Sequence, residues 1–167
     1  MKLWGPLSAI GLIFAVFAFG IDQAFKWWML GVFDIAARQP VNLLPFFDVV
    51  LAWNTGISYG WFAGHGQEAR IVLIVLSVAV SLLLWLWLAK TIRPLAAAGI
   101  GLVIGGALAN ALDRIIHGAV ADFFHFHVGE LSWYIFNLAD MAIVAGVAAL
   151  LYDSILEGRR KGGHGNA

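Results

Sequence analysis

The side chains best suited to chemistry belong to an asparagine–aspartate pattern that occurs twice in the chain. Asn110 and Asp113 form one Asn-x-x-Asp pattern, and Asn137 and Asp140 form the other. Because residues three apart share one face of a helix, each pattern sets an amide beside a carboxylate. A third carboxylate, Asp122, lies between them. Two carboxylates that share a site do not both ionise readily, so one can activate water while the other donates a proton.

The neighbours of each carboxylate indicate which of them do chemistry. Asp140 lies in an apolar stretch with no cation close in sequence, which makes it the best candidate for a working acid. Asp122 follows Ala121 and precedes Phe123 and Phe124. These neighbours predict a dry cleft and a raised pKa for the Asp122 carboxyl.

Two other aspartates have a cation close in sequence. Arg114 directly follows Asp113, which favours a permanently ionised carboxylate and a positioning role there. Asp22 precedes Lys26 by four residues, a spacing that favours an ion pair on a helix. The repeated pattern suggests Asp113 and Asp140 as a competing pair. A working dyad must let one member hold a proton, so we expect Asp122 to be the partner of Asp140.

Other reaction centres have weaker support in the sequence. A zinc site could be built from His117, His125 and His127 with Asp122, but the spacing is loose and no His-Glu-x-x-His motif is present. Residues 56–60 read Gly-x-Ser-x-Gly, a motif that acts as a nucleophile elbow only at a strand-to-helix turn of an α/β sheet. The chain has no cysteine and therefore no thiolate site. We expect neither a metal nor a cofactor.

The composition predicts that a membrane protein positions these residues. The 167 residues are 62% apolar and 12% charged, with ten basic and ten acidic side chains. Soluble domains are about 45 to 50% apolar and about 25% charged, which excludes an ordinary soluble globule. Nucleic-acid binding needs a clustered basic excess, so we expect no nucleic-acid partner.

Long apolar stretches predict four transmembrane helices. Residues 3–21, 71–89 and 94–112 contain no charged residue, and 131–152 contain only Asp140. Each stretch is long enough, at about 1.5 Å per residue, to cross a hydrocarbon core of roughly 30 Å. Within 94–112, Gly101 and Gly105 predict close helix packing. The first stretch exceeds the apolar region of a cleaved signal peptide, the alternative interpretation of this segment.

The segments between and after the helices predict the rest of the fold. Residues 41–62 are rich in Val, Phe, Trp and Tyr and are interrupted by Pro and Gly, which predicts a small β-sheet on the outer face. Residues 113–130 are expected to form a short amphipathic segment at the membrane surface. The predicted fold class is thus an all-α membrane protein with four transmembrane helices and a small sheet between the first two. Residues 1–157 would form one domain, and residues 158–167 a polar, disordered tail.

The basic residues predict the orientation of the helices. Lys2, Lys90, Arg93 and the basic cluster 159–161 fall on the side that holds both termini. By the positive-inside rule, both termini are cytoplasmic. Most acidic residues lie at or beyond the opposite ends of the helices, so carboxylate chemistry is expected at the outer face.

Five short blocks, in order over about 120 residues, resemble the lipoprotein signal peptidase (signal peptidase II) family. They are Ile-Asp-Gln at 21–23 followed by Lys26, the stretch Trp-Asn-Thr-Gly-Ile-Ser-Tyr-Gly at 53–60, the helix end 105–114, Val-Ala-Asp-Phe at 120–123 and Phe-Asn-Leu-Ala-Asp at 136–140. The chain departs from the usual pattern of the family at Ala109, commonly Gly, and at Ala121, commonly Val. Both substitutions keep a small or apolar side chain, so the chemistry is expected to be preserved.

The resemblance implies a membrane aspartic endopeptidase that cuts prolipoproteins on the amino side of a diacylglyceryl-modified cysteine. In the family, the catalytic pair corresponds to Asp122 and Asp140 here. The residues that match the family's substrate-binding or supporting positions are Asp22, Asn54, Asn110, Asp113, Arg114 and Asn137. Of these, Arg114, Asn54 and Asn110 are expected to hold peptide carbonyls in a water-poor site.

The resemblance also implies a location and a set of partners. The expected location is the bacterial inner membrane, with the site near the periplasmic face and the sheet on that side. The partners are prolipoprotein and membrane lipid, and the chain is expected to act as a monomer without a cofactor. The alternatives are a small proton-coupled transporter, whose acids should lie near the midplane of the membrane, and a non-catalytic membrane scaffold.

Overall fold

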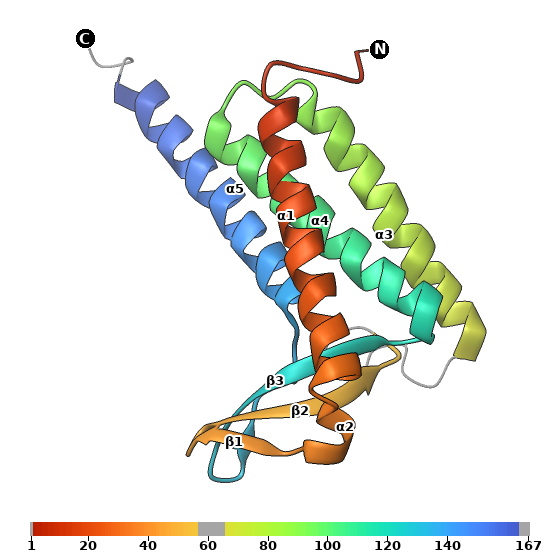
Figure 1. The fold of residues 1–167 in the computed structure, drawn as a ribbon. Coiled ribbons are helices and arrows are strands. Elements are labelled where there is room, and N and C mark those ends of the chain that lie inside the picture. Colours follow the sequence, from red (N-terminus) through yellow and green to blue (C-terminus); the bar gives the residue numbers. More distant parts are fainter. Residues whose placement is uncertain (1, 57–65, 164–167) are drawn as a thin grey trace.

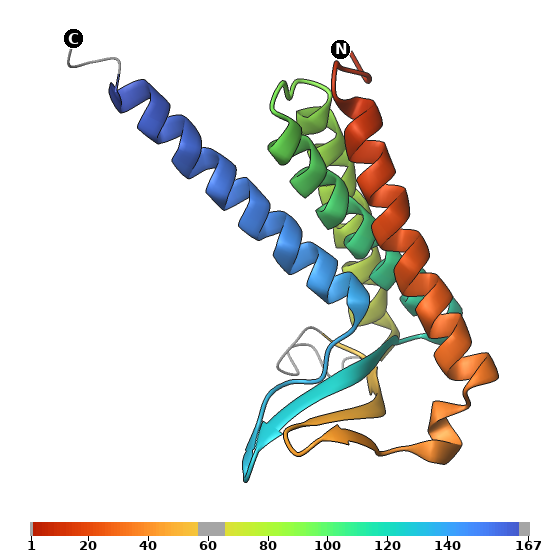
Figure 2. The same ribbon diagram turned by 60° about the vertical axis from the view of Figure 1, so that its left-hand side comes forward.

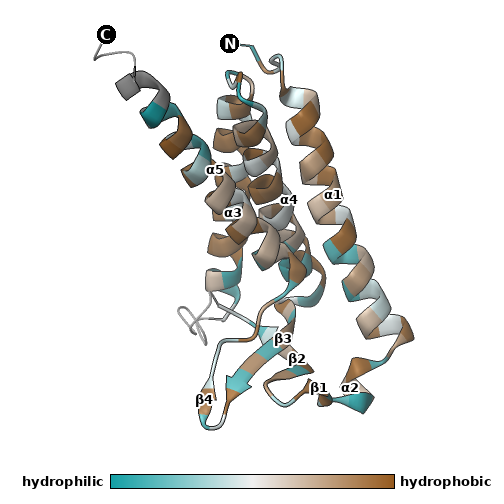
Figure 3. Ribbon diagram, turned by 90° about the vertical axis from the view of Figure 1, so that its left-hand side faces the viewer, coloured by the Kyte–Doolittle hydropathy of each residue, from teal (hydrophilic) through white to brown (hydrophobic). Residues whose placement is uncertain are grey.

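Four long apolar helices form the body of the protein (Figure 1). The computed structural model describes residues 2–56 and 66–163. Helix α1 (Ser8–Trp27) continues through the π-helical turn η1 (Trp28–Val32), and α3 (Gly66–Leu88), α4 (Pro94–His117) and α5 (Leu138–Gly163) follow. Each is long and apolar enough to cross a membrane, so the described residues contain the four apolar helices that the sequence predicts. Figure 3 shows apolar residues along most of the length of these helices.

Helix α4 is the central helix and packs against α1, α3 and α5. Its glycines permit this close packing. A Cβ atom on Gly101 or Gly105 would lie within 3.0 Å of the carbonyl oxygens of Gly11 and Ala15 in α1. On the other side, a Cβ atom on Gly106 would lie 2.5 Å from the carbonyl oxygen of Ala139 in α5. The close approach predicted from Gly101 and Gly105 is therefore confirmed, since no larger residue fits between the backbones.

A four-stranded antiparallel sheet lies at one end of the helices, opposite the end that holds both termini (Figures 1 and 2). Its strands are β1 (Val41–Leu44), β2 (Phe47–Asn54), β3 (Val120–Val128) and β4 (Leu131–Ser132), in that spatial order. The short helix α2 (Ile35–Arg38) precedes β1. Met29, Ile35 and Val49 pack with Ala121 and Phe123 in one buried cluster, which attaches the sheet to the end of α1.

The sequence predicted a sheet formed only by residues between the first two helices. In the structure that segment supplies β1 and β2, whereas β3 and β4 come from the segment between α4 and α5. Residues 113–130 were expected to form an amphipathic surface segment. Instead, α4 continues to His117 and ends at Gly118, whose φ of 79° lies in the left-handed region that favours glycine. The next residues form β3, and they pair with β2 in a register that sets Asp122 opposite Ala52.

The predicted boundaries of the first and last helices also need correction. Helix α1 begins at Ser8 and continues past residue 21, so Asp22 lies within it. Helix α5 begins at Leu138, because Asn137 caps it and residues 131–132 belong to β4. At its other end, α5 is helical to Gly163, beyond the expected start of a disordered tail at residue 158. Arg93 pairs with Asp153 at 3.0 Å and with Glu157, and these contacts hold the last part of the helix against the start of α4.

Candidate active site

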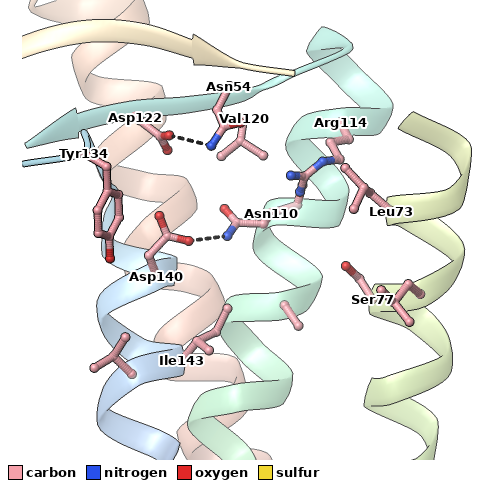
Figure 4. Close-up of a pocket in the computed structure, with 13 residues that line it drawn as sticks. Asn54, Leu73, Ser77, Asn110, Arg114, Val120, Asp122, Tyr134, Asp140 and Ile143 are labelled. Atoms are coloured by element: carbon pink, nitrogen blue, oxygen red, sulfur yellow. Dashed lines mark hydrogen bonds between the residues drawn. The ribbon is translucent and has the colours of Figure 1, made fainter. Parts of the chain in front are cut away.

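Asp122 and Asp140 line one cavity at the end of the helices next to the sheet (Figure 4). The cavity has a volume of about 340 Å³. Helix α3 supplies Leu73, Leu76 and Ser77 to its wall, and α4 supplies Ala107, Asn110 and Arg114. The remaining lining residues come from the sheet, the segment after it and α5: Asn54, Val120, Asp122, Tyr134, Asp140, Ile143 and Val144. The two predicted dyad members, distant in sequence, thus face the same space.

The first turn of α5 holds Asp140 in place through a reciprocal cap. The backbone N–H of Asp140 donates to the side-chain oxygen of Asn137 at 2.9 Å, and the backbone N–H of Asn137 donates to the Asp140 carboxylate at 3.3 Å. This arrangement satisfies two N–H groups at the start of the helix, as a capping box does. The Asn110 side-chain amide donates to the other Asp140 oxygen at 2.9 Å (Figure 4).

Strand β3 carries Asp122, which is only 2% exposed. Its carboxylate accepts hydrogen bonds from the side-chain amides of Asn54, at 3.1 Å, and Asn137, at 2.6 Å. Burial of the carboxyl group, followed by the charge of Asp140, raises the pKa of Asp122 to about 7. The raised pKa expected for Asp122 is therefore present, and this group can hold or release a proton near neutral pH.

Asn137 contacts both carboxylates, since its side-chain amide donates to the Asp122 carboxylate and its backbone N–H donates to the Asp140 carboxylate. Its amide also donates to the side-chain oxygen of Asn110 at 3.2 Å. The three asparagines Asn54, Asn110 and Asn137 thus direct amide N–H groups at the two carboxylates. Asn54 and Asn110 were expected to contact a peptide. In the structure their side-chain amides donate to the aspartates, and the expected contact with a peptide stays a prediction.

A buried ion cluster supports this network from α1 and α4. Lys26 pairs with Asp22 at 2.8 Å, which confirms the predicted i,i+4 pair, and with Asp113 at 2.7 Å. Asp22 also accepts the backbone N–H of Ala139 at 2.9 Å, at the positive end of the α5 dipole. Asp113 accepts the backbone N–H of Ala121 at 3.2 Å. The cluster therefore contacts the backbone beside both Asp122 and Asp140.

The predicted partner of Asp113 was wrong, because Lys26 and not Arg114 pairs with it. Consecutive side chains on a helix point in different directions, so Arg114 turns away from Asp113. Its guanidinium donates to the carbonyl oxygens of Gly56, at 2.7 Å, and Asn110, at 3.2 Å. The buried Nε of Arg114 has no hydrogen-bond partner in the described part of the chain. Arg114 also lines the cavity.

Sequence reasoning missed three contributors to the site. Gln23 donates to Asp113 at 2.8 Å and to Asp22 at 3.2 Å. Lys26 was matched to the family but not placed in the site, and only the fold reveals its second carboxylate. Tyr134 lines the cavity from the segment after β4, where no local pattern distinguishes it. Of these three contributors, only Gln23 could have been placed near the site from the sequence, because it directly follows Asp22.

Two alternative reaction centres were considered in the sequence, the zinc set and the Gly-x-Ser-x-Gly stretch, and the structure describes only the first of them completely. Among the described residues, the zinc set with Asp122 is not assembled, because Asp122 contacts Asn54 and Asn137 while the His117 ring lies 5.3 Å from that of Trp53. The Gly-x-Ser-x-Gly stretch lies at residues 56–60, of which 57–60 are outside the described residues.

Comparison with known proteins points to one family. Residues 14–156 match the family described as signal peptidase (SPase) II. A lipoprotein signal peptidase of Nitrobacter hamburgensis is 53% identical over 155 residues, which cover 90% of this chain and 94% of that protein. The same enzyme of Rhodopseudomonas palustris (strain TIE-1) is 49% identical over 151 residues, covering 88% and 92%. A solved bacterial membrane enzyme has the same fold, with a TM-score of 0.77 over 90% of each chain at 23% identity.

Proposed function

Because the chain belongs to the signal peptidase II family, we propose that it is a membrane aspartic endopeptidase that removes signal peptides from prolipoproteins. The observation that carries this proposal is the pair of carboxylates, Asp122 and Asp140, in one cavity at the end of the helices. Their shared contact with Asn137 holds two acids together in a buried place, which is the requirement for one proton to be divided between them.

In the proposed mechanism, the two carboxyl groups of the dyad share one proton in the substrate-free enzyme. The ionised carboxylate removes a proton from water as the water oxygen bonds to the scissile carbonyl carbon, and the protonated carboxyl gives its proton to the carbonyl oxygen. The carbon–nitrogen bond then breaks as the amine takes a proton from one carboxyl of the dyad. One hydroxyl of the tetrahedral intermediate gives its proton to the other carboxylate, so the dyad again holds one proton. Arg114 lines the cavity, where its guanidinium is proposed to hold a peptide carbonyl of the substrate.

Four apolar helices and the family make this a multi-pass protein of the inner membrane. We propose further that both termini are cytoplasmic and that the sheet and the dyad lie at the periplasmic face. The proposal is supported by the basic residues near the termini and by the sheet at the opposite end of the bundle. A reporter fused after Ala167 should be active only in the cytoplasm. Activity of that fusion in the periplasm would contradict the orientation.

The substrate is proposed to be cut on the amino side of its diacylglyceryl-modified cysteine. The acyl chains anchor that cysteine at the membrane surface, where a dyad at the helix ends can reach the bond. Residues 1–157 would then act as one membrane-embedded peptidase unit, as a monomer. The test is incubation of the purified chain with lipidated and non-lipidated forms of one prolipoprotein. Only the lipidated form should be cut, and equal cleavage of both would contradict the requirement for lipid.

The transporter alternative fits the site less well. Proton-coupled transport needs acids near the midplane, with access from both sides. Here Asp122 belongs to a strand beyond the helix ends, and Asp140 lies in the first turn of α5. A purely structural scaffold would not require two carboxylates in one cavity, each supplied with amide donors.

A further inference from the structure

A second cluster of side chains that can bind metal lies on the sheet, apart from the candidate dyad. The pairing of β2 with β3 sets Asp48 opposite His125, and His127 follows two residues later on the same face of β3. One ligand atom from each of these three residues lies within 4.8 Å of the other two. The same alternation directs Asp122 to the opposite face of β3, so this cluster is separate from the cavity.

Hydrogen bonds already orient the three side chains. The Asn42 amide donates to one oxygen of Asp48 at 2.7 Å, and the second Asp48 oxygen lies 2.8 Å from Nε2 of His127. Nε2 of His125 lies 2.6 Å from the Ser132 hydroxyl, and the two imidazole rings are stacked at 5.2 Å.

We propose that Asp48, His125 and His127 form a binding site for one divalent transition-metal ion, with Zn²⁺ as the ion that best fits the site. Two imidazole nitrogens and one carboxylate oxygen are ligands that Zn²⁺ accepts, with water in the fourth position. Ligand atoms in such a site are about 3.4 Å apart, so modest side-chain rotations close it from the observed spacing. Asn42 acts as the outer partner that orients the carboxylate.

A metal ion bound at this cluster would link two strands of the sheet. Asp48 belongs to β2 and both histidines belong to β3, so a bound ion joins the two strands. These strands also carry Asn54 and Asp122 at their other ends. The ion would therefore stabilise the sheet that presents Asp122, without contacting the cavity. This site differs from the zinc set considered in the sequence, because Asp48 takes the place of Asp122 and His117.

The test is calorimetric titration of the purified full chain, in detergent and free of any polyhistidine tag, with ZnCl₂. The wild type should bind one Zn²⁺ more tightly than about 10 μM at this site. Asp48→Asn and His127→Gln should each weaken that binding at least tenfold. His117→Gln is the matched control, since His117 lies against Trp53 outside the cluster, and it should bind as the wild type does. Mg²⁺ and Ca²⁺, which prefer all-oxygen sites, should not compete.

Thermal unfolding followed by tryptophan fluorescence supplies a second readout that also reports whether each variant is folded. Saturating Zn²⁺ should raise the Tm of the wild type and of His117→Gln, but not that of Asp48→Asn. Absence of binding by the wild type would overturn the proposal. Zn²⁺ affinity and a Tm increase that survive in the folded Asp48→Asn/His127→Gln double variant would overturn it as well.

Discussion

Asn137 donates its side-chain amide to the carboxylate of Asp122 at 2.6 Å, and the same side chain caps the helix that begins just before Asp140. One residue therefore determines where the strand and the helix meet and how their two carboxylates face each other. Its roles in capping and in the site cannot be separated, because both use the same amide group.

Replacing Asn137 should affect stability and activity together. We expect Asn137→Ala to lower the free energy of unfolding by about 1 to 3 kcal/mol, since it removes a helix cap and a buried hydrogen bond. The kcat of the folded fraction should fall by about 100-fold as the carboxylates lose their alignment. Unfolding by tryptophan fluorescence and cleavage assays measure the two effects. Asn42→Ala, which alters an exposed asparagine on β1, should retain cleavage. Normal kcat in Asn137→Ala would contradict the role of this residue.

The pH dependence of cleavage should report the titration of Asp122. The pKa of Asp122 is raised to about 7, so its carboxyl group is mostly protonated below pH 7 and mostly ionised above pH 7. Because the mechanism needs one protonated carboxyl, kcat/KM should fall about tenfold per pH unit above roughly 7. A profile of kcat/KM from pH 5 to 9, at constant ionic strength, provides the measurement. A rate that stays level from pH 7 to pH 9 would show that no such proton is needed.

The ion cluster of Lys26 with Asp22 and Asp113 should contribute to the free energy of unfolding. Lys26 is 3% exposed and lies between Asp22 and Asp113. Lys26→Met leaves two carboxylates buried without their cation, and we expect a loss of about 3 to 5 kcal/mol in the free energy of unfolding. Adding Asp113→Asn removes one of those charges and should restore part of the stability. If the double variant is less stable than Lys26→Met, the cluster does not act as an ion pair.

Replacing a glycine of α4 by alanine, at a position where α4 contacts α1, should destabilise the protein. Gly105→Ala brings a Cβ atom against the backbone of Ala15, which cannot move aside as a flexible side chain would. We expect the free energy of unfolding to fall by about 1 to 3 kcal/mol. Gly20→Ala is the matched control, because nothing lies within 4 Å of its added methyl group. Equal Tm values for the two variants would contradict the close approach of α1 and α4.

Local patterns in the sequence predicted those features that depend on neighbouring residues. Charge-free stretches identified the four helices, and the Asp22–Lys26 spacing identified an ion pair. Contacts between distant segments could not be predicted in this way. Asp22 accepts the N–H of a residue 117 positions away, and Asn54 donates to a carboxylate 68 positions away. Strand β3 was missed although five of its nine residues are Val or Phe, which favour strands, because its pairing with β2 cannot be predicted from its own residues.

The most direct test of the dyad is single-turnover cleavage of a lipidated prolipoprotein by excess enzyme. Asp122→Asn and Asp140→Asn should each lower the cleavage rate by about 10³-fold or more, while the folded variants still bind the substrate. Asp48→Asn, which changes a carboxylate on the same sheet outside the cavity, should cleave at the wild-type rate. A near-normal rate for Asp122→Asn or Asp140→Asn would contradict the assignment of these two residues as the catalytic pair.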